Sequence, residues 1–170
     1  MKQTVPHPAT CIGHVHLWVS DLDRAIAFYR DVLGLHLTED MRDATPPRGM
    51  AFLAAGDYHH HVGLRERKTP VLQESTGLFH FALRYPNRLE LARAFKRVLD
   101  VAYPIDSVVD YGPGEAVNVS DPDGNGVELA YDRPAEAWPR IDGQLRVYVK
   151  KLDRDDLLAE LEREPVTTAS

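Results

Sequence analysis

Alternating hydrophobic and polar residues predict a strand near the start of the chain, and helical spacing follows it directly. Residues 12–19 alternate with a period of two, which is typical of a half-buried strand. Apolar residues then recur every three or four positions over about 21–33, with Ser20 or Asp21 as an N-cap and Gly34 where helices commonly end. The predicted strand carries His14, His16 and Trp18 on one face and Val15, Leu17 and Val19 on the other.

The same succession of a strand, a helix and three further strands is predicted twice. After the first helix the expected strands are 35–38, 50–54 and 59–65. The second copy is expected as a strand at 78–84, a helix at 88–99 and strands at 105–109, 115–119 and 127–131. A tail follows, with a short strand pattern at 145–149 and a helix pattern from Asp153 to about Glu162.

A direct repeat underlies this order. When His14 to Gly34 is shifted by 66 positions, it lies on His80 to Asp100 without a gap, and Tyr29 falls on Phe95. A duplicated unit implies two similar halves whose equivalent residues approach each other across a pseudo-twofold axis. We therefore expect an α+β fold of paired βαβββ modules in a single domain, residues 1–170. The expected parts are module 1 at about 11–66, module 2 at about 78–132 and a C-terminal tail at 133–170.

Bulk composition restricts the classes of function. The chain has 170 residues, 44% hydrophobic and 27% charged, which is ordinary for a globular protein. A net charge of −6 argues against nucleic acid and anionic membrane as partners. There is no apolar run long enough to span a bilayer and no signal-peptide pattern. The single cysteine, Cys11, cannot form an internal disulfide, so a cytoplasmic location is expected.

Three residues are candidate metal ligands. His14 and His80 occupy matching places in the repeat, and Glu128 lies on the last strand of the second copy, two residues beyond Gly126. Two imidazoles and one carboxylate suit divalent iron, manganese, zinc or nickel and leave coordination positions open. Each residue taken alone is better interpreted as an ordinary polar side chain. Their joint placement in a duplicated frame favours the metal site.

Three consecutive histidines, His59 to His61, precede the end of the first copy. Alternation places His59 and His61 on one face of the expected strand and His60 on the other. His61 is a candidate general base, because imidazole titrates near neutral pH. For His59 and His60, a polar edge strand is the better interpretation.

Both ends of the repeated region resemble the vicinal oxygen chelate superfamily. Its members include glyoxalase I, bleomycin-resistance proteins, fosfomycin-resistance enzymes and type I extradiol dioxygenases, which share paired βαβββ modules that form a cup around a metal. The matching stretches are Gly13-His14-Val15-His16-Leu17 through Val32-Leu33-Gly34, and Asp121-Pro122-Asp123-Gly124-Asn125-Gly126-Val127-Glu128-Leu129. The extradiol branch, especially its catechol 2,3-dioxygenase-like members, is indicated by Tyr58 to Leu64, Gly77 to Leu83, and Asp132-Arg133-Pro134 followed by Trp138-Pro139.

This resemblance implies a function and a set of roles. By position, His14, His80 and Glu128 match the iron ligands of the family, and His61 matches the histidine that takes a proton from the catechol. The implied protein is an Fe(II) extradiol dioxygenase that cleaves a catechol-like vicinal diol with dioxygen; manganese, zinc and nickel are the alternative metals. Tyr111 and Asn118 stand where ring-cleaving members usually carry histidine and tyrosine.

Two other functions stay open at this stage. A glyoxalase-like isomerase or lyase would use the same cup with zinc or nickel, but a second inward glutamate to pair with Glu128 is not evident. A non-enzymatic binding protein of the resistance type would lack the full ligand set that this chain carries. By analogy with the family we also expect a homodimer.

Overall fold

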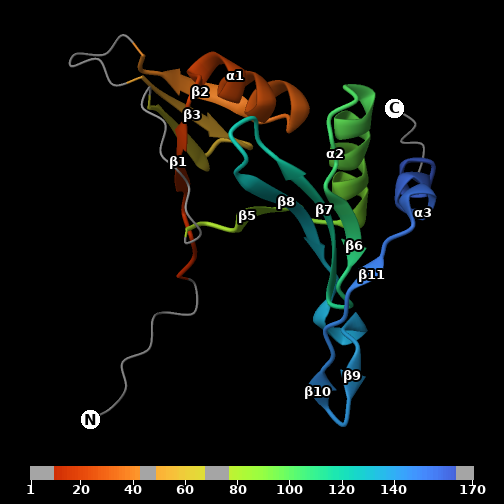
Figure 1. The fold of residues 1–170 in the computed structure, drawn as a ribbon. Helices are drawn as coiled ribbons and strands as arrows, with labels where there is room; N and C mark the ends of the chain where they lie inside the picture. The colour runs from red at the N-terminus through yellow and green to blue at the C-terminus, as the bar shows by residue number, and fades with distance from the viewer. Residues whose placement is uncertain (1–9, 43–48, 68–76, 164–170) are drawn as a thin grey trace, which may run out of the picture.

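Two β-sheets form the framework of the protein (Figure 1). A computed structural model describes residues 10–42, 49–67 and 77–163. The first sheet has the order β1-β4-β3-β2, and the second has the order β11-β6-β7-β8-β5. Their strands are β1 (Val15–Val19), β2 (His36–Asp40), β3 (Met50–Ala54), β4 (Val62–Glu66), β5 (His80–Arg84), β6 (Ser107–Asp110), β7 (Gly114–Ser120), β8 (Gly126–Asp132) and β11 (Lys150–Lys151).

The helices begin at residues whose side chains cap them. Asp21 accepts from the Arg24 N–H and Asn87 accepts from the Glu90 N–H, and these caps begin the helices of the two modules. None of the helices within the described ranges is long and apolar enough to cross a membrane. The helices are α1 (Leu22–Ala27), which continues as a π-helix (Phe28–Val32), α2 (Arg88–Asp100), α3 (Arg154–Leu158) and two 3-10 helices (Ala135–Ala137 and Ala159–Leu161).

The predicted α+β class and the two βαβββ modules are confirmed. In each module the first strand pairs in parallel with the last, β1 with β4 and β5 with β8, and the other pairs within the modules are antiparallel. The repeat of 66 residues superimposes β3 on β7 and β4 on β8, but β2 falls before β6. The assignment of 1–170 to one domain stays a prediction.

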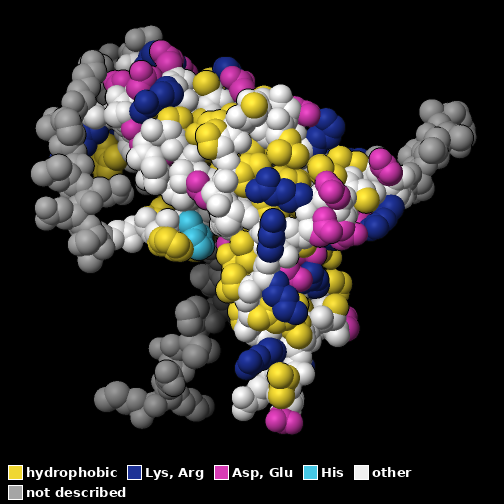
Figure 2. Space-filling view, turned by 45° about the vertical axis from the view of Figure 1, so that its right-hand side comes forward, with side chains coloured by type: hydrophobic (Ala, Val, Ile, Leu, Met, Phe, Trp, Pro, Cys, Tyr) yellow, Lys and Arg dark blue, Asp and Glu magenta, His cyan; other side chains and the backbone are white. Residues whose placement is uncertain are grey.

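The expected tail strand at 145–149 is wrong in its extent. The backbone here changes partners midway, because the Arg146 N–H donates to the Pro139 carbonyl and the Tyr148 N–H donates to the Tyr111 carbonyl. A small hairpin of β9 (Arg140–Ile141) and β10 (Gln144–Leu145) therefore precedes β11. The hairpin projects from the rest of the molecule as an arm (Figure 1), and Figure 2 shows hydrophobic side chains on its surface.

One hydrophobic core joins the two modules. The first helical segment supplies Phe28, which lies 4.9 Å from the Tyr103 ring, and Tyr29, which lies 6.5 Å from the Phe81 ring. Tyr29 and its repeat equivalent Phe95 are both fully buried. The helix of the first module thus packs against the second module, which fixes the two sheets relative to each other.

A network of ion pairs centred on Arg88 attaches the C-terminal helical segment to this core. The Glu115 carboxylate, 4% exposed, accepts from Arg88 Nε at 2.7 Å and from Arg133 Nη2 at 2.5 Å. Arg88 also donates to Asp156 at 2.7 Å and to Glu160 at 2.8 Å, both on the C-terminal helical segment. Because both ends of the guanidinium are engaged, Arg88 connects α2, β7 and α3.

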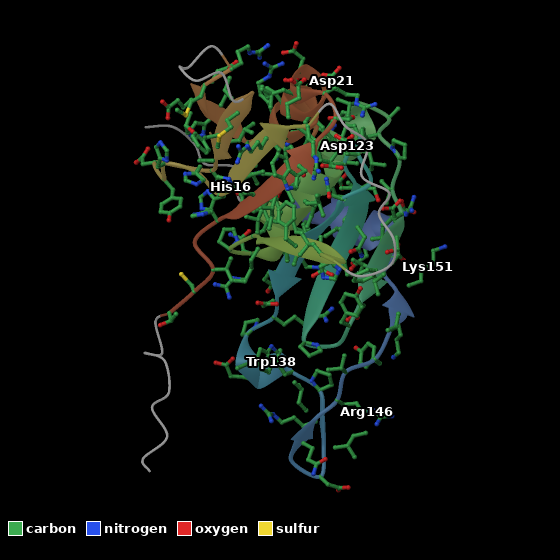
Figure 3. All side chains as sticks on the ribbon, turned by 60° about the vertical axis from the view of Figure 1, so that its left-hand side comes forward. His16, Asp21, Asp123, Trp138, Arg146 and Lys151 are labelled. Carbon is green, nitrogen blue, oxygen red and sulfur yellow. The ribbon has the colours of Figure 1, made fainter. Side chains whose placement is uncertain are left out.

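Asp121 joins the modules through the turn between β7 and β8. Its carboxylate accepts four hydrogen bonds, from the backbone N–H groups of Asp123 and Asn125, the Asn125 amide and the Tyr29 hydroxyl at 3.0 Å. Burial, reinforced by the charge of Asp121, raises the pKa of Tyr29 well above its usual range. Asp123 in turn contacts Ser20 and forms an ion pair with Arg24 at 3.1 Å, beside the start of α1 (Figure 3).

We predict that Tyr29→Phe lowers the free energy of unfolding by about 1.5–3 kcal/mol, because it removes a buried donor to a carboxylate. Urea denaturation measures the change. Tyr58→Phe is the control, since Tyr58 is 50% exposed, and it should change stability by less than about 0.5 kcal/mol. Equal losses in both variants would contradict a special role for the Tyr29 hydroxyl.

Candidate functional site

Two of the predicted ligands meet on the second sheet. His80 on β5 lies opposite Gly126 on β8, and Ala82 lies opposite Glu128, so His80 and Glu128 are diagonal neighbours on one face. His80 Nε2 and Glu128 Oε2 are 4.0 Å apart. Gly126 permits this approach, because a Cβ there would lie 2.6 Å from the Phe79 carbonyl oxygen. An imidazole and a carboxylate at this separation can bind one cation.

The third predicted ligand, His14, gathers with other histidines at the first sheet. Its ring centroid lies 5.1 Å from that of His16 and 4.5 Å from that of His60. Among the described residues, these three form the one group of histidine, cysteine or acidic side chains whose ligand atoms all lie within 4.8 Å of one another. His14, His80 and Glu128 together do not form such a group, although β1 and β5 begin on the same side of the molecule (Figures 1 and 3). The assignment of these three ligands stays a prediction.

The histidine cluster has a defined internal geometry. His16 Nε2 lies 3.4 Å from His60 Nε2, and His60 Nδ1 lies 2.7 Å from His59 Nδ1. Partial burial lowers the pKa of His16 and of His60, and the neighbouring histidines lower each pKa further. These shifts favour the neutral imidazole, which is the form that binds metals.

Alternation was wrong for the triple histidine. β4 begins only at Val62, so His59 to His61 precede the strand and do not follow its period. His60 consequently lies beside His14 and His16, and no pattern along the chain marks it as a candidate ligand. The one signal was His16, which shares a strand face with His14 and lies opposite Gly63 in the register of β1 and β4.

His61, the predicted general base, is held between β1 and β3. Its carbonyl accepts from the Val15 N–H at 3.0 Å, and its N–H donates to the Leu53 carbonyl at 2.9 Å. The Ala55 N–H donates to the ring Nδ1 at 3.3 Å. In this arrangement the neutral ring carries its proton on Nε2, so removal of a substrate proton by Nε2 requires a change of tautomer.

An open pocket of about 450 Å³ lies beside His80, on the face of the second sheet that carries Glu128. It is lined by Phe79 and His80 together with Tyr111 and Asn118, the two positions that differ from the ring-cleaving pattern. The Asn118 amide donates to the Ser107 hydroxyl at 3.0 Å, which fixes a polar wall. A pocket of this size with mixed lining suits a small organic molecule.

Comparison with known proteins identifies the family. Residues 11–129 match the Glyoxalase/Bleomycin resistance protein/Dioxygenase superfamily, and the chain belongs to this superfamily. The catechol-2,3-dioxygenase of Bacillus subtilis is 33% identical over 158 residues, which cover 91% of this chain and 53% of that protein. The chain thus spans about half the length of this relative.

Two further proteins are similar to the chain in sequence or in fold. The biphenyl-2,3-diol 1,2-dioxygenase 3 of Rhodococcus globerulus is 29% identical over 140 residues, 78% of this chain and 70% of that protein. A fosfomycin resistance protein of Listeria monocytogenes, solved as a mutant with Mn(II) and 1S,2S-dihydroxypropylphosphonic acid, shares the fold. Its TM-score is 0.59 at 20% identity, covering 73% of this chain and 93% of that chain. The structural likeness establishes the fold, and divalent metal binding is a property of the superfamily.

Proposed function

We propose that the protein is a metal-dependent extradiol-type dioxygenase that cleaves a catechol-like vicinal diol. The observation that carries this proposal is the pairing of His80 and Glu128 at 4.0 Å beside the 450 Å³ pocket. The relatives from Bacillus and Rhodococcus, both named as dioxygenases of aromatic diols, support it.

The donor set fits a divalent metal. We propose that His80 and Glu128 hold the ion with His14 as the third ligand, and that the ion is Fe(II). Two neutral imidazoles and one carboxylate suit Fe(II) and also Mn(II), Zn(II) and Ni(II). When bound, the metal would supply a Lewis acid and an electron path between the diol and dioxygen.

The chain's own residues bind and orient the substrate in this proposal. Phe79 offers an apolar ring to the pocket lining, and Asn118 with Ser107 offers polar groups. His61 accepts the substrate proton at Nε2. For this its own proton must move to Nδ1, so the hydrogen bond from the Ala55 N–H to Nδ1 is broken first. The ring carbon–carbon bond beside the diol breaks and both atoms of dioxygen enter the product, so no external reductant is consumed.

We expect the protein to consume one dioxygen per diol after anaerobic reconstitution with Fe(II). An oxygen electrode and the absorbance of the ring-opened product measure the reaction with catechol and substituted catechols. His80→Ala and Glu128→Gln should each reduce the rate by more than about 100-fold. Replacing a residue that only supports a metal ligand usually costs less than this. His61→Asn should reduce kcat by about 10²–10⁴ through lost proton transfer.

His36→Ala is the matched control, because His36 is exposed on β2 and should leave the rate unchanged. Absence of oxygen uptake with every vicinal diol tested, in protein shown to contain Fe(II), would remove the dioxygenase proposal. Full activity in Glu128→Gln would instead remove the ligand assignment.

We also propose a homodimer in which the arm of the β9–β10 hairpin and the segment after it contact a second copy. The support is the exposure of Ile141 (56%) and Leu145 (43%) on the arm, and of Val147 (60%) and Val149 (75%) on the segment after it.

The corresponding prediction concerns mass in solution. Light scattering after size-exclusion chromatography should give twice the mass of the chain. Replacing Val147 and Val149 together by aspartate should shift the protein toward the monomer, because charge is costly in an apolar interface. Val101→Asp, at an exposed valine outside the arm, should leave the dimer intact. A monomeric wild-type protein would contradict the proposal.

A further inference from the structure

We propose that His14, His16 and His60 form a second metal site, on the first module, that binds an imidazole-preferring divalent transition metal such as Zn(II). This site goes beyond the proposed dioxygenase centre, because it uses neither His80 nor Glu128. The ligand atoms of the three histidines already lie within 4.8 Å of one another. His14 and His16 are exposed, so an ion can reach them directly from solvent.

The distance between two of the ring nitrogens matches shared coordination. Nitrogens bound to one Zn(II) at about 2.0–2.1 Å and at a tetrahedral angle lie about 3.4 Å apart. His16 Nε2 and His60 Nε2 are 3.4 Å apart. His14 is exposed, and its ligand atom lies within 4.8 Å of the other two, so it can supply a third nitrogen to the same ion.

His60 also has the partner that a metal-bound histidine requires at its other nitrogen. Its Nδ1 lies 2.7 Å from His59 Nδ1, and His59 Nε2 lies 3.5 Å from Glu39 Oε2. Glu39 thus orients His59, and His59 accepts the proton of His60 Nδ1. This fixes the tautomer of His60 and makes its Nε2 a better ligand. The residues around His60 therefore hold its Nε2 toward His16 as a ligand atom.

Gly63 makes room for this arrangement. A Cβ at Gly63 would lie 2.6 Å from His16 Nε2, so the ring occupies the space that any larger residue would fill. On the same face the Phe52 ring lies 4.6 Å from that of His60 and 5.8 Å from that of His16. An aromatic ring and a missing side chain thus set the positions of both imidazoles.

Because His14 belongs to both donor sets, the two sites exclude each other. Occupation of the three-histidine site withdraws His14 from His80 and Glu128. Three imidazoles without a carboxylate favour Cu(II), Ni(II) and Zn(II) over Fe(II) in the usual order of affinities. The chain is thus expected to bind one ion of this kind per copy.

Zn(II) binding to the metal-free full chain tests the site, measured by calorimetry and by metal analysis after dialysis. The double variant His80→Ala/Glu128→Gln removes the proposed dioxygenase set and should retain one Zn(II) per chain. Adding His16→Ala or His60→Ala to it should weaken binding by more than about 100-fold, and adding His59→Ala by about 10–100-fold. Adding His36→Ala should leave binding unchanged.

Gly63→Ala provides a variant that keeps every histidine. Its methyl displaces only the far end of the His16 side chain, so the fold should persist, as circular dichroism checks, while Zn(II) binding weakens at least tenfold. Loss of Zn(II) from the double variant, or retention of full affinity when His16 and His60 are both replaced, would overturn the second site. Neither result bears on the dioxygenase assay, which is measured with Fe(II) and a diol.

Discussion

The arrangement of the two modules depends on one buried carboxylate. Asp121 is 4% exposed and would carry a large desolvation cost if its oxygens lacked partners. Its four donors come from two places, the turn that follows β7 and the Tyr29 hydroxyl of the other module. The same side chain therefore shapes the turn and anchors it to the first-module helix, whose aromatic side chains pack against the second module.

The turn that Asp121 shapes leads directly into β8, the strand that carries Glu128. The turn ends at Gly126, where β8 begins, and Gly126 pairs with His80. Two residues further on, Glu128 projects from the same face. The close approach of β5 and β8 at Gly126, which no larger residue would allow, brings the imidazole of His80 and the carboxylate of Glu128 together. The relative positions of His80 and Glu128 thus depend on a turn that the Tyr29 hydroxyl of the first module holds in place.

Local sequence patterns predicted most of the strands and helices, because hydrophobic periodicity reflects the geometry of each element. The short apolar run 50–54 located β3 at its observed bounds, and the repeat located α2 and the strands that carry His80 and Glu128. The tail strand failed because its backbone partners, the Pro139 and Tyr111 carbonyls, lie in other segments. The histidine cluster was missed for a related reason: His60 precedes β4, and the direction of a loop side chain has no sequence period. The role of Gly63, which leaves space for the His16 ring, can be recognised only once the register of β1 and β4 is known.

His14 is common to two proposed sets of metal ligands that differ in their chemistry. With His80 and Glu128 it would contribute to a set that contains one negative charge and lies beside the pocket, which suits a redox metal that must meet an organic substrate. With His16 and His60 it contributes to a neutral set on the other sheet, and none of these three residues lines that pocket. An ion held there would lack the carboxylate ligand and the residues that line the pocket. The side-chain orientation of one exposed histidine would then decide whether the metal takes part in catalysis or is held apart from it.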